Sequence, residues 1–359
     1  LDANYAEAQY GLGWSLYHLE RFGDAIEPLL DAINLKPDLG AAHFTLGQTY
    51  AAYKSFPQAI DEFKETLRLI PTYPEAYIEL GNAYLKNRDY DLAIGAYQEA
   101  IELNPGFFEA FTAIGVAYTE SGREKQAIEP LKNALKINPD DDVAYLNLGI
   151  AYKNLGQHEE AIDAFLELIR IRFKDPEAYF LLASEYFVED LYDDAIQRFK
   201  DAIRLEPDHI DAHFQLSQVY DETGDLEESL REFDKVIQIQ PRNLEGHYRK
   251  GDIYQRLGDD KAAAKSFEEA LIIDSDHTLS NYQLGLSYIK MDRHEDALEK
   301  FKKAIESDSR FPEAYFQMGS ILAYLKRFKK AIDPLKKATN LKPDFSQAYY
   351  ELGNAYSHL

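Results

Sequence analysis

The sequence predicts an all-α solenoid built from helix–turn–helix repeats of 34 residues. Three observations lead to this fold class: a 34-residue period along the whole chain, small and large residues at fixed places in each period, and a proline near the end of most periods. A chain of 359 residues would ordinarily divide into globular domains, because a single core stops growing at about 250 to 300 residues. A solenoid avoids that limit, since its core grows by stacking.

The period is marked by a Leu-Gly pair, or a close variant of it, that recurs without insertions. A fixed spacing of this kind is the signature of a repeat architecture. With the glycine numbered as position 8, each repeat also has a ring or leucine at position 11, alanine or serine at position 20 and a large apolar residue at position 24. The residues at position 8 are Gly13, Gly47, Gly81, Gly115, Gly149, Ala183, Ser217, Gly251, Gly285, Gly319 and Gly353.

The first helix of each repeat is predicted by positions 4, 7, 8 and 11, which fall on one stripe at about 100° per residue. Positions 20, 24 and 27 form the corresponding stripe of a second helix. Small residues at positions 8, 20 and 27 allow close approach, and large residues at positions 7, 11 and 24 fill the space around them. Proline at position 32, as in Pro37 and Pro71, lacks an amide donor and ends the second helix.

The domain boundaries follow from the same count. Residues 1–5 are interpreted as the remnant of a preceding repeat, residues 6–345 as ten complete repeats, and residues 346–359 as a lone first helix of an eleventh. We therefore expect the chain to be excised from a longer protein.

These offsets resemble the tetratricopeptide repeat family over essentially the whole chain. The resemblance implies a right-handed superhelix in which the first helices line a concave groove for peptides, and it implies no reaction. The pattern is broken locally by Phe173 in place of proline, and by Ala183 and Glu185 where glycine and a small apolar residue are usual. A glutamate at a half-buried position needs a partner, and we expect Arg170 or Arg172 to supply it.

Composition restricts the function further. The chain has 39 lysine and arginine residues and 63 aspartate and glutamate residues, so its net charge is −24. This charge disfavours nucleic acid as a partner and allows a basic protein partner. The absence of cysteine removes disulfides and thiolate sites. No apolar run approaches the roughly 18 residues of a membrane span. We expect a cytoplasmic protein without a membrane span.

No catalytic or metal-binding constellation stands out. His209 and His213 are four residues apart, but no glutamate is placed as in the metalloprotease motif, and His213 and His247 occupy the bulky packing position. No Ser/His/Asp set, phosphate loop or dinucleotide fingerprint is present. We therefore expect no enzyme activity, no cofactor and no metal site.

The candidate site lies on the opposite side of the first helices, at positions 2, 5, 9, 12 and 13, which face the groove in the family. Position 5 is aromatic in most repeats, and these rings have two interpretations, packing between helices or ligand binding. Position 9 varies, as expected of a recognition surface. Aromatic rings, mixed charge and the broken pattern coincide in repeats six to eight. We predict peptide contacts at Phe180, Ser184, Phe187, Phe214, Gln218, Asp221, Tyr248, Asp252, Gln255 and Arg256.

The leading functional hypothesis is a scaffold that binds proteins or peptides in this groove. One alternative is a substrate-selecting arm of a larger enzyme, such as a glycosyltransferase, and another is a self-assembling structural element. The final helix carries Tyr349, Leu352 and Tyr356 on its packing stripe with no following helix to cover them. We expect end-to-end self-association of this face with the first repeat near Tyr10 and Trp14.

Overall fold

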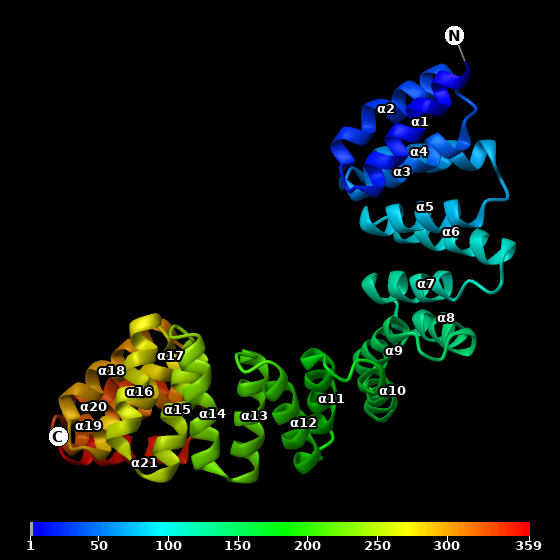
Figure 1. Cartoon of the computed structure of the whole chain (residues 1–359). Helices are drawn as coiled ribbons and strands as arrows, with labels where there is room; N and C mark the ends of the chain where they lie inside the picture. Colours follow the sequence, from blue (N-terminus) through cyan, green and yellow to red (C-terminus); the bar gives the residue numbers. More distant parts are fainter. Residues whose placement is uncertain (1–2) are drawn as a thin grey trace. The chain divides into compact units, whose positions relative to one another are not determined.

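The computed structural model describes residues 3–359, with side chains from Tyr5 onward. Over this range the backbone forms twenty-one α-helices and no strand. Figure 1 shows them as successive antiparallel pairs joined by short turns. The all-α class and the helix–turn–helix repeat are thus confirmed. Contacts define two compact units, one ending at Glu189 and the other running from Asp190 to Leu359.

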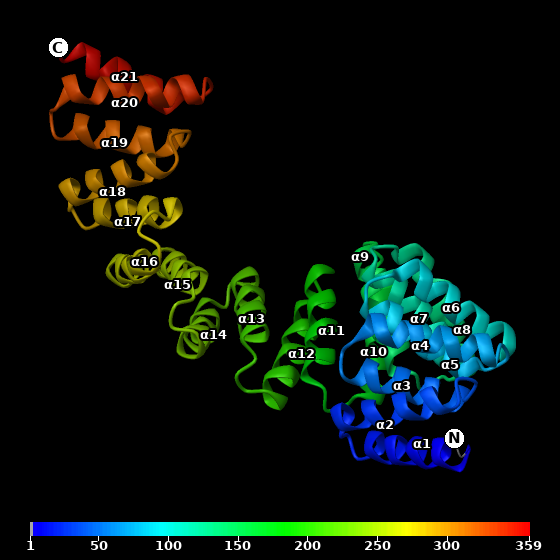
Figure 2. The same ribbon diagram turned by 90° about the horizontal axis from the view of Figure 1, so that it is seen from above.

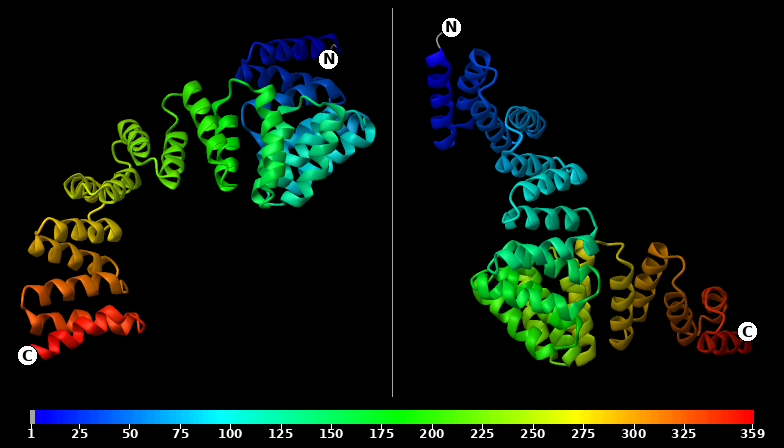
Figure 3. Two further views of the ribbon diagram at one scale, coloured as in Figure 1. Left: turned by 90° about the horizontal axis from the view of Figure 1, so that it is seen from below. Right: turned by 90° about the vertical axis from the view of Figure 1, so that its right-hand side faces the viewer.

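The first unit contains eleven helices, and the first helices of successive repeats touch one another from α1 to α9. The right-hand view of Figure 3 shows the blue and cyan helices stacked in chain order. Their bounds are α1 (Ala3–His18), α2 (Phe22–Leu35), α3 (Gly40–Ala52), α4 (Phe56–Leu69), α5 (Pro74–Lys86), α6 (Tyr90–Leu103), α7 (Phe108–Glu120), α8 (Glu124–Ile137), α9 (Asp142–Asn154), α10 (His158–Ile171) and α11 (Pro176–Val188).

The second unit contains ten helices. Figure 2 shows α17 to α21 stacked in order, so that each helix lies beside its neighbours in sequence. The helices are α12 (Tyr192–Leu205), α13 (Ile210–Thr223), α14 (Leu226–Ile239), α15 (Leu244–Leu257), α16 (Asp260–Ile273), α17 (Thr278–Lys290), α18 (His294–Ser307), α19 (Pro312–Tyr324), α20 (Phe328–Leu341) and α21 (Ser346–Ser357).

The helix boundaries keep one register. From α3 onward every first helix begins at position 1 of its repeat, and from α2 onward every second helix begins at position 17. At the N-terminus α1 begins at Ala3, before the Ala6 with which we began the first repeat. Leu1 and Asp2 of the predicted remnant lie outside the described residues. No helix in the described part of the chain is both long and apolar enough to cross a bilayer.

Close packing between the two helices of a repeat explains the small residue at position 8. A Cβ atom added to Gly149 would lie 2.4 Å from Cε1 of Phe165, the ring at position 24, and one added to Gly81 would lie 2.5 Å from Cε1 of Tyr97. Both rings are fully buried. The predicted assignment of small residues to helix approach and large ones to space filling agrees with these distances.

A recurrent hydrogen bond joins each of several repeats to the one before it. The side chain at position 4 donates to the backbone carbonyl at position 32 of the preceding repeat. In repeat seven, Nε2 of His213 lies 2.9 Å from the carbonyl oxygen of Pro207, while Nδ1 lies 2.6 Å from Glu232. The same carbonyl contact is made by His43, Tyr179, His247 and Asn281. His213 and His247 therefore have structural roles here.

Glu185 is almost completely buried, as its place in the broken repeat suggested, but the predicted partner is wrong. Its carboxylate lies 2.7 Å from Nδ1 of His158 and 3.5 Å from Nζ of Lys153. Arg170 instead pairs with Asp140, in the turn before α9, and Arg172 pairs with Asp142, the first residue of α9. The reason is distance along the helix, because His158 begins α10 and Arg170 is twelve residues further on, roughly 18 Å away at the α-helical rise.

Candidate peptide-binding groove

The predicted site residues fall on three first helices. Phe180, Ser184 and Phe187 lie on α11 in the first unit, and the other seven residues lie on α13 and α15 in the second unit. On α11, Ser184 is buried and its hydroxyl donates to the carbonyl of Phe180 at 2.9 Å. Phe180 and Phe187 are partly exposed.

The aromatic residues at position 5 pack within their own repeats. The Phe214 ring lies 5.7 Å from the Phe233 ring, and Tyr248 lies 5.8 Å from Phe267 and 5.6 Å from His277. These are the positions 24 and 34 that Phe44 also contacts in repeat two. Both Phe214 and Tyr248 remain partly exposed. Their packing role is therefore present, and any ligand would meet only the exposed part of each ring.

Five charged side chains meet on α13 and α15. Arg256 forms an ion pair with Asp221 of α13, and Arg249 pairs with Glu245 of the same helix at 2.6 Å. Asp252 is half-buried between these pairs. Burial raises the pKa of Asp252, Arg256 lowers it, and the neighbouring Asp221 raises it again. The net effect is a pKa raised above the ordinary value for aspartate, because the cost of burying the carboxylate outweighs the attraction of Arg256 and Arg249.

Gln255 connects α15 to the next first helix. Its Nε2 donates to the carbonyl of Gln283 at 3.0 Å and to Oγ of Ser287 at 2.9 Å, both on α17. Neither α17 residue was among the predicted site residues. The repeat spacing could have identified them, because position 12 of one repeat lies beside positions 6 and 10 of the next. Gln218, on α13, is partly exposed.

The arrangement supports recognition better than chemistry. Tyr248, Asp252 and Arg256 present a ring, a carboxylate and a guanidinium along one helix, with Asp221 beside them. Within the described residues no group of three or more histidine, aspartate or glutamate side chains is arranged to hold a metal ion.

Family comparison matches the C-terminal domain of cilia and flagella-associated protein 70 over residues 21–240, which is more than half of the chain. Tetratricopeptide repeat models match residues 1–39, 244–277, 279–311 and 319–359. No curated protein matches the sequence.

Several solved structures are similar. The C-terminal part of a repeat-containing protein from Cytophaga hutchinsonii has a TM-score of 0.61 at 16% identity, covering 67% of this chain and 99% of that one, and it shows the fold alone. MamA has 29% identity and a TM-score of 0.44, and the match covers 45% of this chain and 95% of MamA. YrrB, described as having an unusual peptide-binding site, has 22% identity and a TM-score of 0.48. The match covers 53% of this chain and 97% of YrrB. Neither of these two matches supports a functional conclusion.

Proposed function

The chain belongs to the tetratricopeptide repeat family, and from that premise we propose that it is a scaffold that binds a protein or peptide and catalyses no reaction. Regular helices supply a rigid frame, and the residues on the lining vary from repeat to repeat. A varied surface on a rigid frame is suited to recognition. A cytoplasmic location stays a prediction.

The partner class that this surface favours is a basic peptide. The supporting observation is Asp252, a half-buried carboxylate whose neighbouring arginines are engaged with Asp221 and Glu245. A half-buried carboxylate without its own cation is costly, and a lysine or arginine from a partner would offset that cost. Tyr248 lies on the same helix, and its ring already has the Arg249 guanidinium over it at 6.0 Å, so the attraction for a partner's cation comes from Asp252.

A peptide array tests this proposal. The full chain is applied to synthetic 15-residue peptides whose net charge ranges from acidic to basic, and binding is read by fluorescence. We expect basic peptides with an apolar residue to be retained, and the double variant Phe214→Ala with Asp252→Asn to lose them. Phe44→Ala is the matched control, because Phe44 makes the same ring contact in repeat two without an adjacent Asp252.

Helical content measured by circular dichroism separates lost binding from lost folding. The proposal is contradicted if the double variant keeps its helical content and still retains the same peptides. It is equally contradicted if the array shows no preference for basic over acidic sequences.

A further inference from the structure

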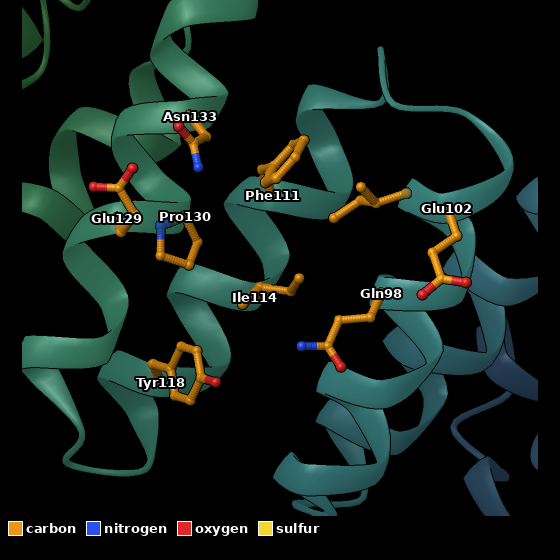
Figure 4. Close-up of a pocket in the computed structure, with 9 residues that line it drawn as sticks. Gln98, Glu102, Phe111, Ile114, Tyr118, Glu129, Pro130 and Asn133 are labelled. Carbon is orange, nitrogen blue, oxygen red and sulfur yellow. The ribbon is translucent and has the colours of Figure 1, made fainter.

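A cavity of about 500 Å³ opens between α6 and α8, above α7, in the first unit. Figure 4 shows α7 as its floor, with Phe111 and Ile114 between side chains from the two second helices. Tyr118 and Pro130 complete the apolar lining, and Glu102 and Glu129 are at the rim. The α7 residues are those of the packing stripe, so the cavity is separate from the predicted groove.

A lysine that other joints between repeats contain is missing here. At four joints a lysine at position 25 lies over the position 11 tyrosine of the next repeat, whereas at this joint position 25 is Gln98 and the tyrosine is Tyr118. Arg123 approaches that ring to 4.9 Å but does not line the cavity. The complete pairs are Lys64 with Tyr84, Lys132 with Tyr152, Lys200 with Tyr220 and Lys336 with Tyr356, at 5.5 to 5.7 Å.

Two further substitutions make the floor apolar and leave an acceptor without its usual donor. Position 4 is Phe111, where repeat seven has the His213 that donates to a carbonyl. Phe111 has no donor to offer the equivalent carbonyl of Pro105. Position 23 is Pro130 at this joint. In repeat seven the same position is Glu232, which lies within hydrogen-bond distance of His213. This joint therefore lacks the two polar contacts that the histidines of repeats two and seven make.

The rim is acidic. Glu102 is exposed, and none of the ion pairs among the described residues neutralises it. Glu129 is 72% exposed and lies 3.8 Å from Lys136, a loose surface pair of little energetic value. Carboxylates, a tyrosine ring that lines the cavity and an apolar floor together match a long side chain with an aliphatic stem and a cationic end.

We propose that this cavity is a second peptide-binding site, which takes a lysine or arginine side chain from a partner protein. The stem of that side chain packs on Phe111 and Ile114, and its charged end occupies the place over Tyr118 that the chain's own lysine occupies at other joints. The volume admits an apolar neighbour as well, so the occupant is a basic residue flanked by leucine-like residues.

Methyl NMR of the full chain measures occupancy directly, because Ile101 and Ile114 both line the cavity. The probes are three acetylated tripeptide amides, Leu-Arg-Leu, Leu-citrulline-Leu and Leu-Glu-Leu. We expect the arginine probe to shift the δ1-methyl signals of both isoleucines saturably. The citrulline probe, which has the same shape without the charge, should bind about tenfold more weakly, and the glutamate probe should leave both signals unchanged.

Gln98→Lys introduces the lysine that four other joints have, so the variant should fold normally. Its affinity for the arginine probe should be about tenfold lower or more. Gln126→Lys on α8 makes the same charge change at an exposed residue outside the lining, and it should leave the affinity within about twofold. Unmoved methyl signals, equal shifts from the arginine and glutamate probes, or unchanged affinity in Gln98→Lys would each overturn the proposal.

Discussion

At position 8, the glycine backbone and the position 24 side chain come into direct contact. Alanine at Gly149 would improve helix propensity by about 1 kcal/mol, but its Cβ would lie 2.4 Å from a fully buried ring that has no room to move. Overpacking costs about 1–3 kcal/mol, so the steric effect prevails. We predict that Gly149→Ala lowers the free energy of unfolding by up to about 2 kcal/mol, read from the urea midpoint.

Gly95 provides the matched control. It is also inside a helix, α6, but a Cβ there would meet nothing within 4 Å. Gly95→Ala should therefore stabilise the protein by about 0.5–1 kcal/mol. If both substitutions shifted the midpoint in the same direction, the assigned role of position 8 would be wrong.

Single residues also show where prediction from the sequence stops. The stripe of small and large residues was predictable, because it depends only on helical periodicity and on the repeat. The partner of Glu185 was not, because His158 and Arg170 lie near opposite ends of α10, and only the fold decides which end the carboxylate reaches. At the site, Asp252 could be assigned to the lining, but the sequence does not show that Arg249 and Arg256 form their ion pairs with Glu245 and Asp221 instead.

At the scale of the element, the turn between the two helices of a repeat has a left-handed residue at position 15. Only Gly122, Gly156, Gly224 and Gly258 are glycines there, while six repeats place another residue at φ between 56° and 66°. The following amide closes the turn, as Ser55 does by donating to the carbonyl of Tyr50 at 2.8 Å. This conformation was not predictable from the sequence, because lysine, arginine and acidic residues occupy the position in six repeats.

The left-handed position gives a pair of opposite expectations. Lys54 has a φ of 63°. We predict that Lys54→Gly raises the free energy of unfolding by about 0.5–1 kcal/mol, because it removes the steric strain of the Cβ atom. Gly156→Ala, at φ 70°, should lower the free energy of unfolding by about 1–2 kcal/mol, because it introduces a Cβ atom into the left-handed conformation. Thermal unfolding followed by circular dichroism measures both. A neutral result for Gly156→Ala would show that the turn tolerates a side chain without strain.

At the scale of the whole molecule, exposed apolar side chains are present on both terminal helices. Tyr349 is 50% and Tyr356 48% exposed on α21, and Leu12 is 50% and Trp14 47% exposed on α1. Burial of apolar surface is worth about 25 cal/mol per Å². We therefore keep the proposal that α21 of one molecule associates with α1 of another, in a head-to-tail contact.

Sedimentation velocity over a concentration series measures this association. We expect the mean mass to rise with concentration, and the variant with Tyr349→Ser and Tyr356→Ser to remain at the monomer mass of 41.2 kDa. A parent chain whose mass stays constant up to the highest concentration would remove the proposal.

The proposed function depends on recognition of a basic peptide by the surface of α13 and α15 through Asp252. Since burial raises the pKa of Asp252, its carboxyl is protonated at acidic pH, and only the ionised form attracts a cation. Binding should therefore be weak below that pKa and strengthen as the pH rises through it, with release of a proton. In the isosteric variant Asp252→Asn this pH dependence should be absent.

Isothermal titration calorimetry of one basic peptide from the array, repeated from pH 4 to pH 7 in buffers of different ionisation enthalpy, measures both affinity and proton release. We expect the parent to bind more tightly at the higher pH with proton release, and Asp252→Asn to bind more weakly and independently of pH. Equal affinity and an identical pH profile in the two proteins would contradict it.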